Sequence, residues 1–356
     1  MIEIFHQFLN RVQQLQSSLD DSEAIDALIK IGFSNETSFS ALGNSKQYLD
    51  CLISNKLNRK VNTYVNSVIL LYGLFEQYVE GILIAYLEKL DFIIDCFCDM
   101  PEKIKKNHTN FSAQLLLNRD LDKYRDRCTE VDIIASLTSC LNDGHFNINA
   151  LAFTDHKSNF RIESLNQFYE PVGISGLSKK ITQEKIFRDF FKKKSPELQI
   201  DNRPDSVLFT DLDDLAWRRN VVAHGWPDET LSVDLLRERI EFIRLVGECI
   251  YNVLLQELLP FIVKHKSSAL SDPIAVYNNS IICFHWELGE IAEGRKIIAV
   301  HPKGIHRLGK IDRIEVNHVQ KSKVIAPPSA DIACKVSLQA KQNYKYYLLN
   351  ENILIE

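Results

Sequence analysis

The sequence predicts a mainly α-helical protein, with a helical bundle followed by a small all-β barrel domain. Over the first two thirds of the chain, apolar residues recur at helical spacing, and after Pro273 the hydrophobic period shortens towards that of strands. With 356 residues, 45% of them hydrophobic and 25% charged, the chain has the length of about two domains and the balance of a globular protein.

Two long helices are predicted to frame the bundle. The first runs from residue 58 to about residue 95, and the second begins near Ser232 and ends at Pro260 or one turn beyond it. Shorter helices are predicted between and around them, over residues 8–30, 111–124, 130–141, 159–170, 182–193 and 211–225. Two long helices of this kind pack naturally as antiparallel neighbours in a bundle.

A polar segment, residues 266–274, is predicted to link a helical domain of residues 1–265 to a β domain of residues 275–356. From Tyr277 onward the chain has 11 Lys and Arg against 8 Asp and Glu, so the β domain is the more basic part. Its short strands are expected over residues 281–287, 296–301, 309–316, 331–338 and 344–349. Such a run of short strands is typical of a small barrel.

Composition excludes several classes of function. The net charge of −5, from 42 Lys and Arg against 47 Asp and Glu, excludes a general polyanion binder, so a nucleic-acid site must be local. Gly-rich phosphate loops and common metal motifs are absent, and the eight cysteines, which lack a C-x-x-C pair, are expected to be buried thiols. We therefore expect no metal and no cofactor.

The N-terminus has no pattern of a secretory signal, and no stretch approaches about 18 uncharged apolar residues. We therefore expect a cytoplasmic protein without a membrane segment.

The most informative segment is residues 210–227, which reads as a helix ended by glycine and proline. His224 falls on its last turn, one turn after Asn220 and on nearly the same face, while Arg219 lies five residues before the histidine. The three polar side chains are predicted to converge at the end of a helix.

The motif Arg-Asn-Val-Val-Ala-His-Gly at residues 219–225 resembles the Arg-x4-6-His signature of the HEPN superfamily. These are all-helical proteins of prokaryotic conflict systems, and many are metal-independent endoribonucleases. Two further segments, residues 74–78 and residues 159–174, are similar to the MAE_28990/MAE_18760 and RiboL-PSP groups within it. The resemblance covers roughly residues 55–260 and implies a HEPN-type helical bundle with ribonuclease activity.

The chemistry of the motif agrees with that implication. An imidazole titrates near neutral pH, so His224 can act as general base on a ribose 2′-OH or as general acid on the leaving 5′-oxygen. Arg219 is suited to hold the phosphorane, because its guanidinium is planar, always charged and bidentate towards phosphate. Asn220 can hold His224 or the phosphate in register. The expected products are a 2′,3′-cyclic phosphate and a 5′-hydroxyl.

The motif supplies only one candidate catalytic histidine per chain, which predicts a homodimer, because this reaction is best served by a base and an acid on opposite sides of the phosphorus. Members of the superfamily typically pair two Arg/His sets across a two-fold axis, which implies a composite active site. Trp217 and Trp226 lie beside the motif and could bury that interface or stack a base. Toxins silenced by a nucleotidyltransferase carry tyrosine where this chain has Trp226, so an antitoxin of that kind is less expected than another antitoxin or defence-system partner.

Other residues are assigned supporting roles. Glu76 on the first long helix is predicted to pair with Arg218 or Arg219 and to orient it. Lys192, Lys193 and Lys194, together with Trp226, are candidates for contact with RNA, although lysine runs are more often solvated helix faces. The alternative is that the motif has a purely structural role, in which a histidine lies at the helix end and an arginine pairs with Asp213 or Asp214.

The β domain has a weak resemblance of its own. Residues 289–302 and the strands that follow are similar to the β-barrel second domain of translation GTPases. This implies delivery to structured RNA, with tRNA as the first candidate, but a barrel that extends the dimer or binds a protein fits equally well.

Two functions follow as hypotheses. The first is a metal-independent endoribonuclease acting as a prokaryotic toxin or anti-phage effector on RNA. The alternative is a catalytically inactive HEPN dimer that binds RNA, a nucleotide or a protein.

Overall fold

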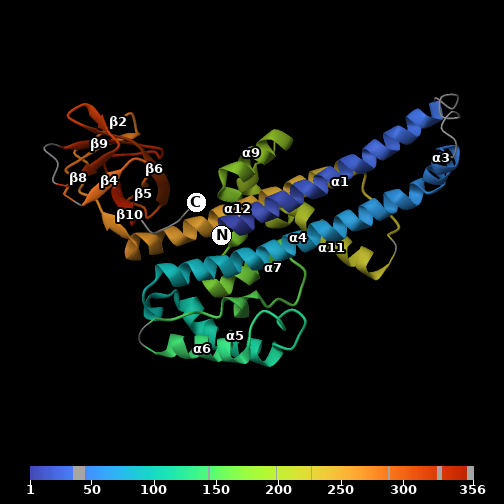
Figure 1. Cartoon of the computed structure of the whole chain (residues 1–356), viewed down its shortest axis with the longest axis horizontal. Coiled ribbons are helices and arrows are strands. Elements are labelled where there is room, and N and C mark those ends of the chain that lie inside the picture. Colours follow the sequence, from blue (N-terminus) through green and yellow to red (C-terminus); the bar gives the residue numbers. More distant parts are fainter. Residues whose placement is uncertain are drawn as a thin grey trace. The chain divides into compact units, whose positions relative to one another are not determined.

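The computed structural model describes residues 1–34, 45–142, 145–197, 199–225, 227–287, 289–326 and 331–350. Within these ranges the chain is helical up to His265 and β-stranded beyond it, which confirms the predicted fold class (Figure 1). The chain divides into two compact units, and each is made of several segments. The first contains residues 1–85, 101–127 and 149–253, and the second contains residues 86–100, 128–148 and 254–356. The division of domains expected at residues 266–274 stays a prediction.

Three long helices dominate the helical part. These are α1 (Ile2–Ser34), α4 (Lys56–Ile93) and α12 (Val233–His265). The apolar periodicity placed α4 and α12 within a few residues of their observed bounds. Pro260 lies inside α12, which continues to His265, the longer of the two expected ends.

The shorter helices connect the long ones. They are α3 (Ser45–Ser54), η2 (Phe97–Asp99), α5 (Glu102–Asn118), α6 (Glu130–Leu141), η3 (Ala150–Thr154), α7 (Ile162–Tyr169), η4 (Glu170–Val172), α8 (Leu177–Gln183), α9 (Lys185–Lys194), η5 (Ile200–Asn202), α10 (Asp205–Leu208) and α11 (Thr210–His224). Helix α6 has its predicted bounds because Thr129 and Asp132 form a capping box at its start. The helix predicted over residues 111–124 was wrong at both ends, because α5 begins directly after Pro101 and ends at Asn118.

The first unit is held together by close packing between its long helices. Phe8 of α1 stacks on Tyr78 of α4, with ring centroids 4.2 Å apart. The Tyr78 hydroxyl donates a hydrogen bond of 2.7 Å to the carbonyl oxygen of Gly247 in α12. Gly247 has no side chain, which allows the Phe8 ring to lie directly against the backbone of α12.

The strands of the second unit are short and antiparallel. They are β1 (Ser267–Ala269), β2 (Ala275–Tyr277), β3 (Ile281–Phe284), β4 (Glu290–Ala292), β5 (Lys296–Val300), β6 (His306–Val316), β7 (Val319–Lys321), β8 (Lys323–Ile325), β9 (Ile332–Val336) and β10 (Lys345–Leu349). All five predicted strands are present. The segment expected to be a linker contains β1, which pairs with β10 in register Ala269 to Tyr347. This edge strand was not predicted, because its sequence Ser-Ser-Ala has no alternation of apolar and polar residues.

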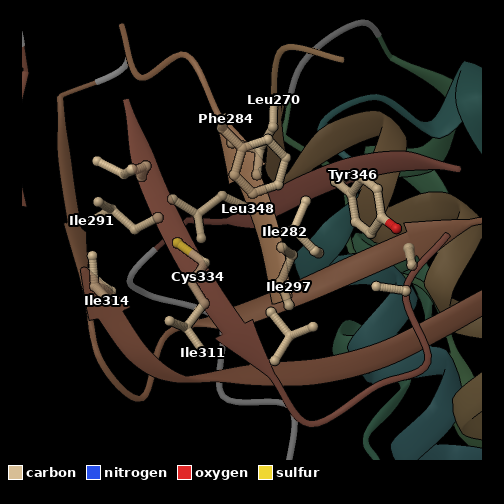
Figure 2. Packing of buried hydrophobic residues seen from close by; sticks show 14 of the residues in the cluster. Leu270, Ile282, Phe284, Ile291, Ile297, Ile311, Ile314, Cys334, Tyr346 and Leu348 are labelled. Carbon is tan, nitrogen blue, oxygen red and sulfur yellow. The ribbon is translucent and has the colours of Figure 1, made fainter. Parts of the chain in front are cut away.

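The predicted barrel is a half-barrel. Its main sheet has the order β1-β10-β5-β6-β9-β3-β2, with β7 on β6, while β4 pairs with β8. Apolar side chains of β3, β5, β6, β9 and β10 point to one side of the sheet, where they form a continuous core (Figure 2). Phe284, Ile297, Ile311 and Cys334 are fully buried in this core.

The cysteines differ in part from expectation. Cys96 and Cys98 form a disulfide rather than free thiols. Cys140, Cys249 and Cys334 are buried free thiols, as predicted.

Helices α4 and α12 are long and apolar enough to cross a membrane by length and composition alone, which the sequence analysis had not anticipated. Their most apolar windows have mean hydropathies of 1.5 and 1.4. However, 50% and 56% of these windows are buried inside the protein, as is usual for core helices of soluble proteins. They therefore give no clear sign of a membrane protein.

Replacing Gly247 tests the packing of α1 on α12. A Cβ atom added at Gly247 would overlap the ring of Phe8. We therefore expect Gly247→Ala to lower the free energy of unfolding by about 1–3 kcal/mol in urea titrations. Gly73→Ala in α4 is the matched control, because a Cβ there meets no atom within 4 Å. It should stabilise the helix by about 0.5–1 kcal/mol. Equal effects of the two variants would contradict this packing.

Candidate functional site

Helix α4 carries three polar side chains on one face of its central part. Tyr72, Glu76 and Glu80 recur every fourth residue and therefore lie on one face. The Tyr72 hydroxyl donates to Oε1 of Glu76 at 3.3 Å. Burial, followed by the negative charge of Glu76, raises the pKa of Tyr72. The phenol therefore stays protonated and serves as a hydrogen-bond donor.

Glu80 holds a charged cluster that includes His156 of the loop before α7, which comprises residues 155–161. Its Oε1 lies 2.8 Å from Nζ of Lys123 and 2.8 Å from Nε2 of His156. Burial alone would raise the pKa of Glu80, but the hydrogen bonds from His156 and Lys123 outweigh burial and lower it. Burial alone would lower the pKa of His156, but the bonds to Glu80 and to the Ser158 carbonyl raise it. The cluster thus favours an ion pair between a carboxylate and an imidazolium.

The same loop is attached to both α4 and α11. The backbone N–H of Phe160 donates to the Tyr72 hydroxyl at 2.8 Å. Nδ2 of Asn159 donates to Oδ1 of Asn220 at 2.6 Å. One residue beyond the loop, the N–H of Ile162 donates to Oδ1 of Asp213 at 2.9 Å. These bonds fix the loop between α4 and α11.

Arg219 is held by uncharged groups. Its Nη1 donates to Oδ1 of Asn220 at 3.3 Å, and its guanidinium carbon lies 5.5 Å from the centre of the Tyr72 ring. An amide and an aromatic face position a guanidinium without neutralising it. The charge of Arg219 therefore stays available for an anionic ligand.

The neighbouring Arg218 has a different environment. Its Nε donates to Oδ2 of Asp214 at 2.8 Å, and its Nη1 donates to the Tyr64 hydroxyl at 2.9 Å. Asp214 also receives a 2.8 Å bond from Arg239 of α12. Arg218 is therefore neutralised by a carboxylate and serves the packing of α11.

His224 lies on the last turn of α11, directly before Gly225, and its side chain is exposed. It stands one turn beyond Asn220, so both residues share a face of the helix. In the described ranges no hydrogen bond or ion pair engages its imidazole. An exposed imidazole can exchange a proton with a bound phosphodiester.

The structure corrects the predicted role of Glu76. Among the described residues no direct ion pair joins it to Arg218, which is bound to Asp214 at helical spacing, or to Arg219, which contacts Asn220 and Tyr72. Glu76 is instead linked to Arg219 through Tyr72. It accepts a hydrogen bond from the Tyr72 hydroxyl, and the Tyr72 ring faces the guanidinium of Arg219. Glu76 also lies 3.9 Å from Nε2 of His156.

The lysines of α9 are not brought to the motif. Lys192, Lys193 and Lys194 are exposed, and Nζ of Lys194 bonds to Glu238 at 2.7 Å. Lys194 also lies 4.0 Å from Asp211 at the start of α11. At about 1.5 Å per residue, that end of α11 is roughly 20 Å from His224. Trp226 lies outside the described residues, and Trp217 is 52% exposed.

Sequence reasoning missed several residues of the site: Tyr72, Glu80, Lys123, His156 and Asn159. A signal was available for Tyr72 and Glu80, because they and Glu76 are polar residues spaced four apart in the same helix. The roles of the other three depend on contacts that no local pattern reveals. Among the described residues, no group of three His, Cys, Asp or Glu side chains is placed to hold a metal ion.

Comparison with known protein families gives a match over the part of the chain that contains the site. A family model described as RiboL-PSP-HEPN matches residues 40–256, which include α4, the loop before α7 and α11. No curated protein matches the chain. Among solved structures, a flavohemoglobin from Malassezia yamatoensis is 11% identical, with a TM-score of 0.14. That match covers 77% of this chain and 64% of the flavohemoglobin, and its TM-score is too low to indicate a shared fold.

The ion pair of Glu80 and His156 predicts a pH-dependent stability. A raised histidine pKa contributes stability below the unfolded pKa of about 6.5, and this is lost as pH rises through the folded pKa. His156→Gln keeps a hydrogen bond but removes the charge. It should cost about 1–3 kcal/mol near pH 5.5, and the cost should shrink in alkaline solution.

Urea unfolding across this pH range measures the effect. His6→Gln is the control, because His6 is exposed on α1. A cost for His156→Gln that is the same at every pH would contradict the ion pair.

Proposed function

The chain belongs to the RiboL-PSP-HEPN family, and from this premise we propose that it is a metal-independent endoribonuclease. HEPN proteins are generally associated with RNase activity. The proposed reaction is transphosphorylation, which leaves a 2′,3′-cyclic phosphate and a 5′-hydroxyl. Arg219, Asn220 and His224 of α11 are the proposed catalytic residues.

The observation that carries this proposal is the contrast between two adjacent arginines. Arg218 is bound to the carboxylate of Asp214, whereas Arg219 is held by an amide and an aromatic ring. A guanidinium that is positioned but not neutralised suits the charge that develops on a pentavalent phosphorane. Asn220 sits between Arg219 and Asn159 and keeps this part of α11 in place.

His224 supplies the proton transfers in the proposed mechanism. A histidine takes the proton of the 2′-OH, the 2′-oxygen attacks phosphorus, and the bond from phosphorus to the 5′-oxygen breaks. A second proton donor protonates the departing 5′-oxygen. One chain offers a single His224, so we propose a homodimer with a composite active site in which the partner copy provides the second group. The half-exposed ring of Trp217 beside the motif suits such an interface.

In the cell, the proposed role is that of a cytoplasmic toxin or anti-phage effector acting on RNA, with tRNA as the first substrate to test. An antitoxin or another defence-system protein is the proposed restraint. The lysines of α9 and Trp226 stay candidates for contact with RNA outside the motif.

Cleavage in the presence of excess EDTA tests the proposal. The purified protein should cut tRNA or single-stranded RNA and leave cyclic phosphate ends. Arg219→Ala and His224→Ala should each lower the rate by about 100-fold or more, because each removes a group that acts in the transition state.

Arg203→Ala is the matched control, because Arg203 is an exposed arginine on a separate loop. Circular dichroism and thermal unfolding should show that all variants are folded. Equal cleavage by wild type and His224→Ala would contradict the assignment. RNA binding without cleavage by any of the proteins would favour the inactive binding module.

A further inference from the structure

A polar pocket opens beside the proposed catalytic residues. It has a volume of about 680 Å³, and its lining is polar throughout: Lys157, Ser158, Asn159, Arg161, Glu163, Ser164, Gln167 and Asn220. Sites for small molecules commonly have volumes of about 300–1,000 Å³, so one nucleotide fits. Asn220 belongs to both places, because it lines the pocket and accepts the hydrogen bond of Arg219. The pocket and the catalytic motif therefore share a wall.

The charges of the pocket favour an anionic ligand. Lys157 and Arg161 are exposed on its rim, with Glu163 as the single carboxylate of the lining. In the described part of the chain, no ion pair engages Lys157 or Arg161. Two cations near a site that already holds Arg219 extend a track of positive charge along which a phosphodiester chain can lie.

The remaining lining groups suit hydrogen bonding to a nucleotide. Asn159 and Gln167 contribute amides, and amides can pair with the edges of unstacked bases. No aromatic side chain lines the pocket among the described residues, so recognition there depends on hydrogen bonds and charge rather than on stacking.

We propose that this pocket binds a nucleotide of single-stranded RNA next to the scissile phosphate, with Lys157 and Arg161 on the backbone phosphates. The subsite extends the proposed ribonuclease function and rests on it. The loop that carries it is attached to α4 by Phe160 and to α11 by Asn159. The rigid attachment keeps the subsite in register with Arg219.

Binding of a short fluorescein-labelled single-stranded oligoribonucleotide tests the subsite. Fluorescence anisotropy is measured with His224→Ala protein, so that the probe is not cut. Adding Lys157→Ala and Arg161→Ala should raise Kd about tenfold and should reduce the slope of log Kd against log salt by about 1.4, since each phosphate contact on a single strand contributes about 0.7.

The matched control is the pair Lys179→Ala and Arg203→Ala, which removes the same charge from exposed positions elsewhere in the first unit. Its Kd should stay within about twofold of the parent protein, because a distant exposed charge is screened by salt. Unchanged binding by the pocket variant, or equal weakening by both pairs, would overturn the subsite.

Cleavage assays of the same variants in the wild-type background separate this proposal from the ribonuclease. Weaker binding in the pocket variant, with no cleavage by wild type, would support the subsite and count against the nuclease. Cleavage by wild type, with KM and kcat unchanged in the pocket variant, would support the nuclease and overturn the subsite.

Discussion

The site depends on one buried phenol, that of Tyr72, which is 1% exposed. Its oxygen accepts the backbone N–H of Phe160 and donates to Glu76, while its ring faces the guanidinium of Arg219. Loss of this oxygen would leave a buried N–H without a partner, at a cost of about 1–3 kcal/mol. A single side chain of α4 thereby sets the position of the loop before α7 and of the part of α11 that carries Arg219.

The two halves of helix α11 differ in how their charged residues are paired. In its first half, Asp211 and Asp214 bind arginines, with Arg239 reaching across from α12. In its second half, Arg219 is held by neutral groups and His224 is exposed. The ion pairs of the first half fix the helix, so that the second half can present an unneutralised guanidinium and an imidazole to a ligand.

The sequence predicted the parts of the fold that depend on local periodicity. Helices α4 and α12 and the five expected strands were found because apolar spacing is a short-range signal. The contacts that build the site are not local: 61 residues separate Asn159 from Asn220, and 88 separate Tyr72 from Phe160. Glu76 contacts Tyr72 rather than Arg218, because Asp214, four residues before Arg218, binds that arginine within the same helix.

In the proposed mechanism the ribose 2′-OH is the nucleophile, and a single 2′-O-methyl group in a defined RNA tests this step. The modified ribose is the one on the 5′ side of the scissile phosphate, in a substrate whose cleavage position has been mapped, and the reaction is run in excess EDTA. We expect cleavage to stop at that phosphate and to continue at other susceptible positions. Cleavage at the protected phosphate at the unmodified rate would contradict it, because the attacking oxygen would then have to come from water.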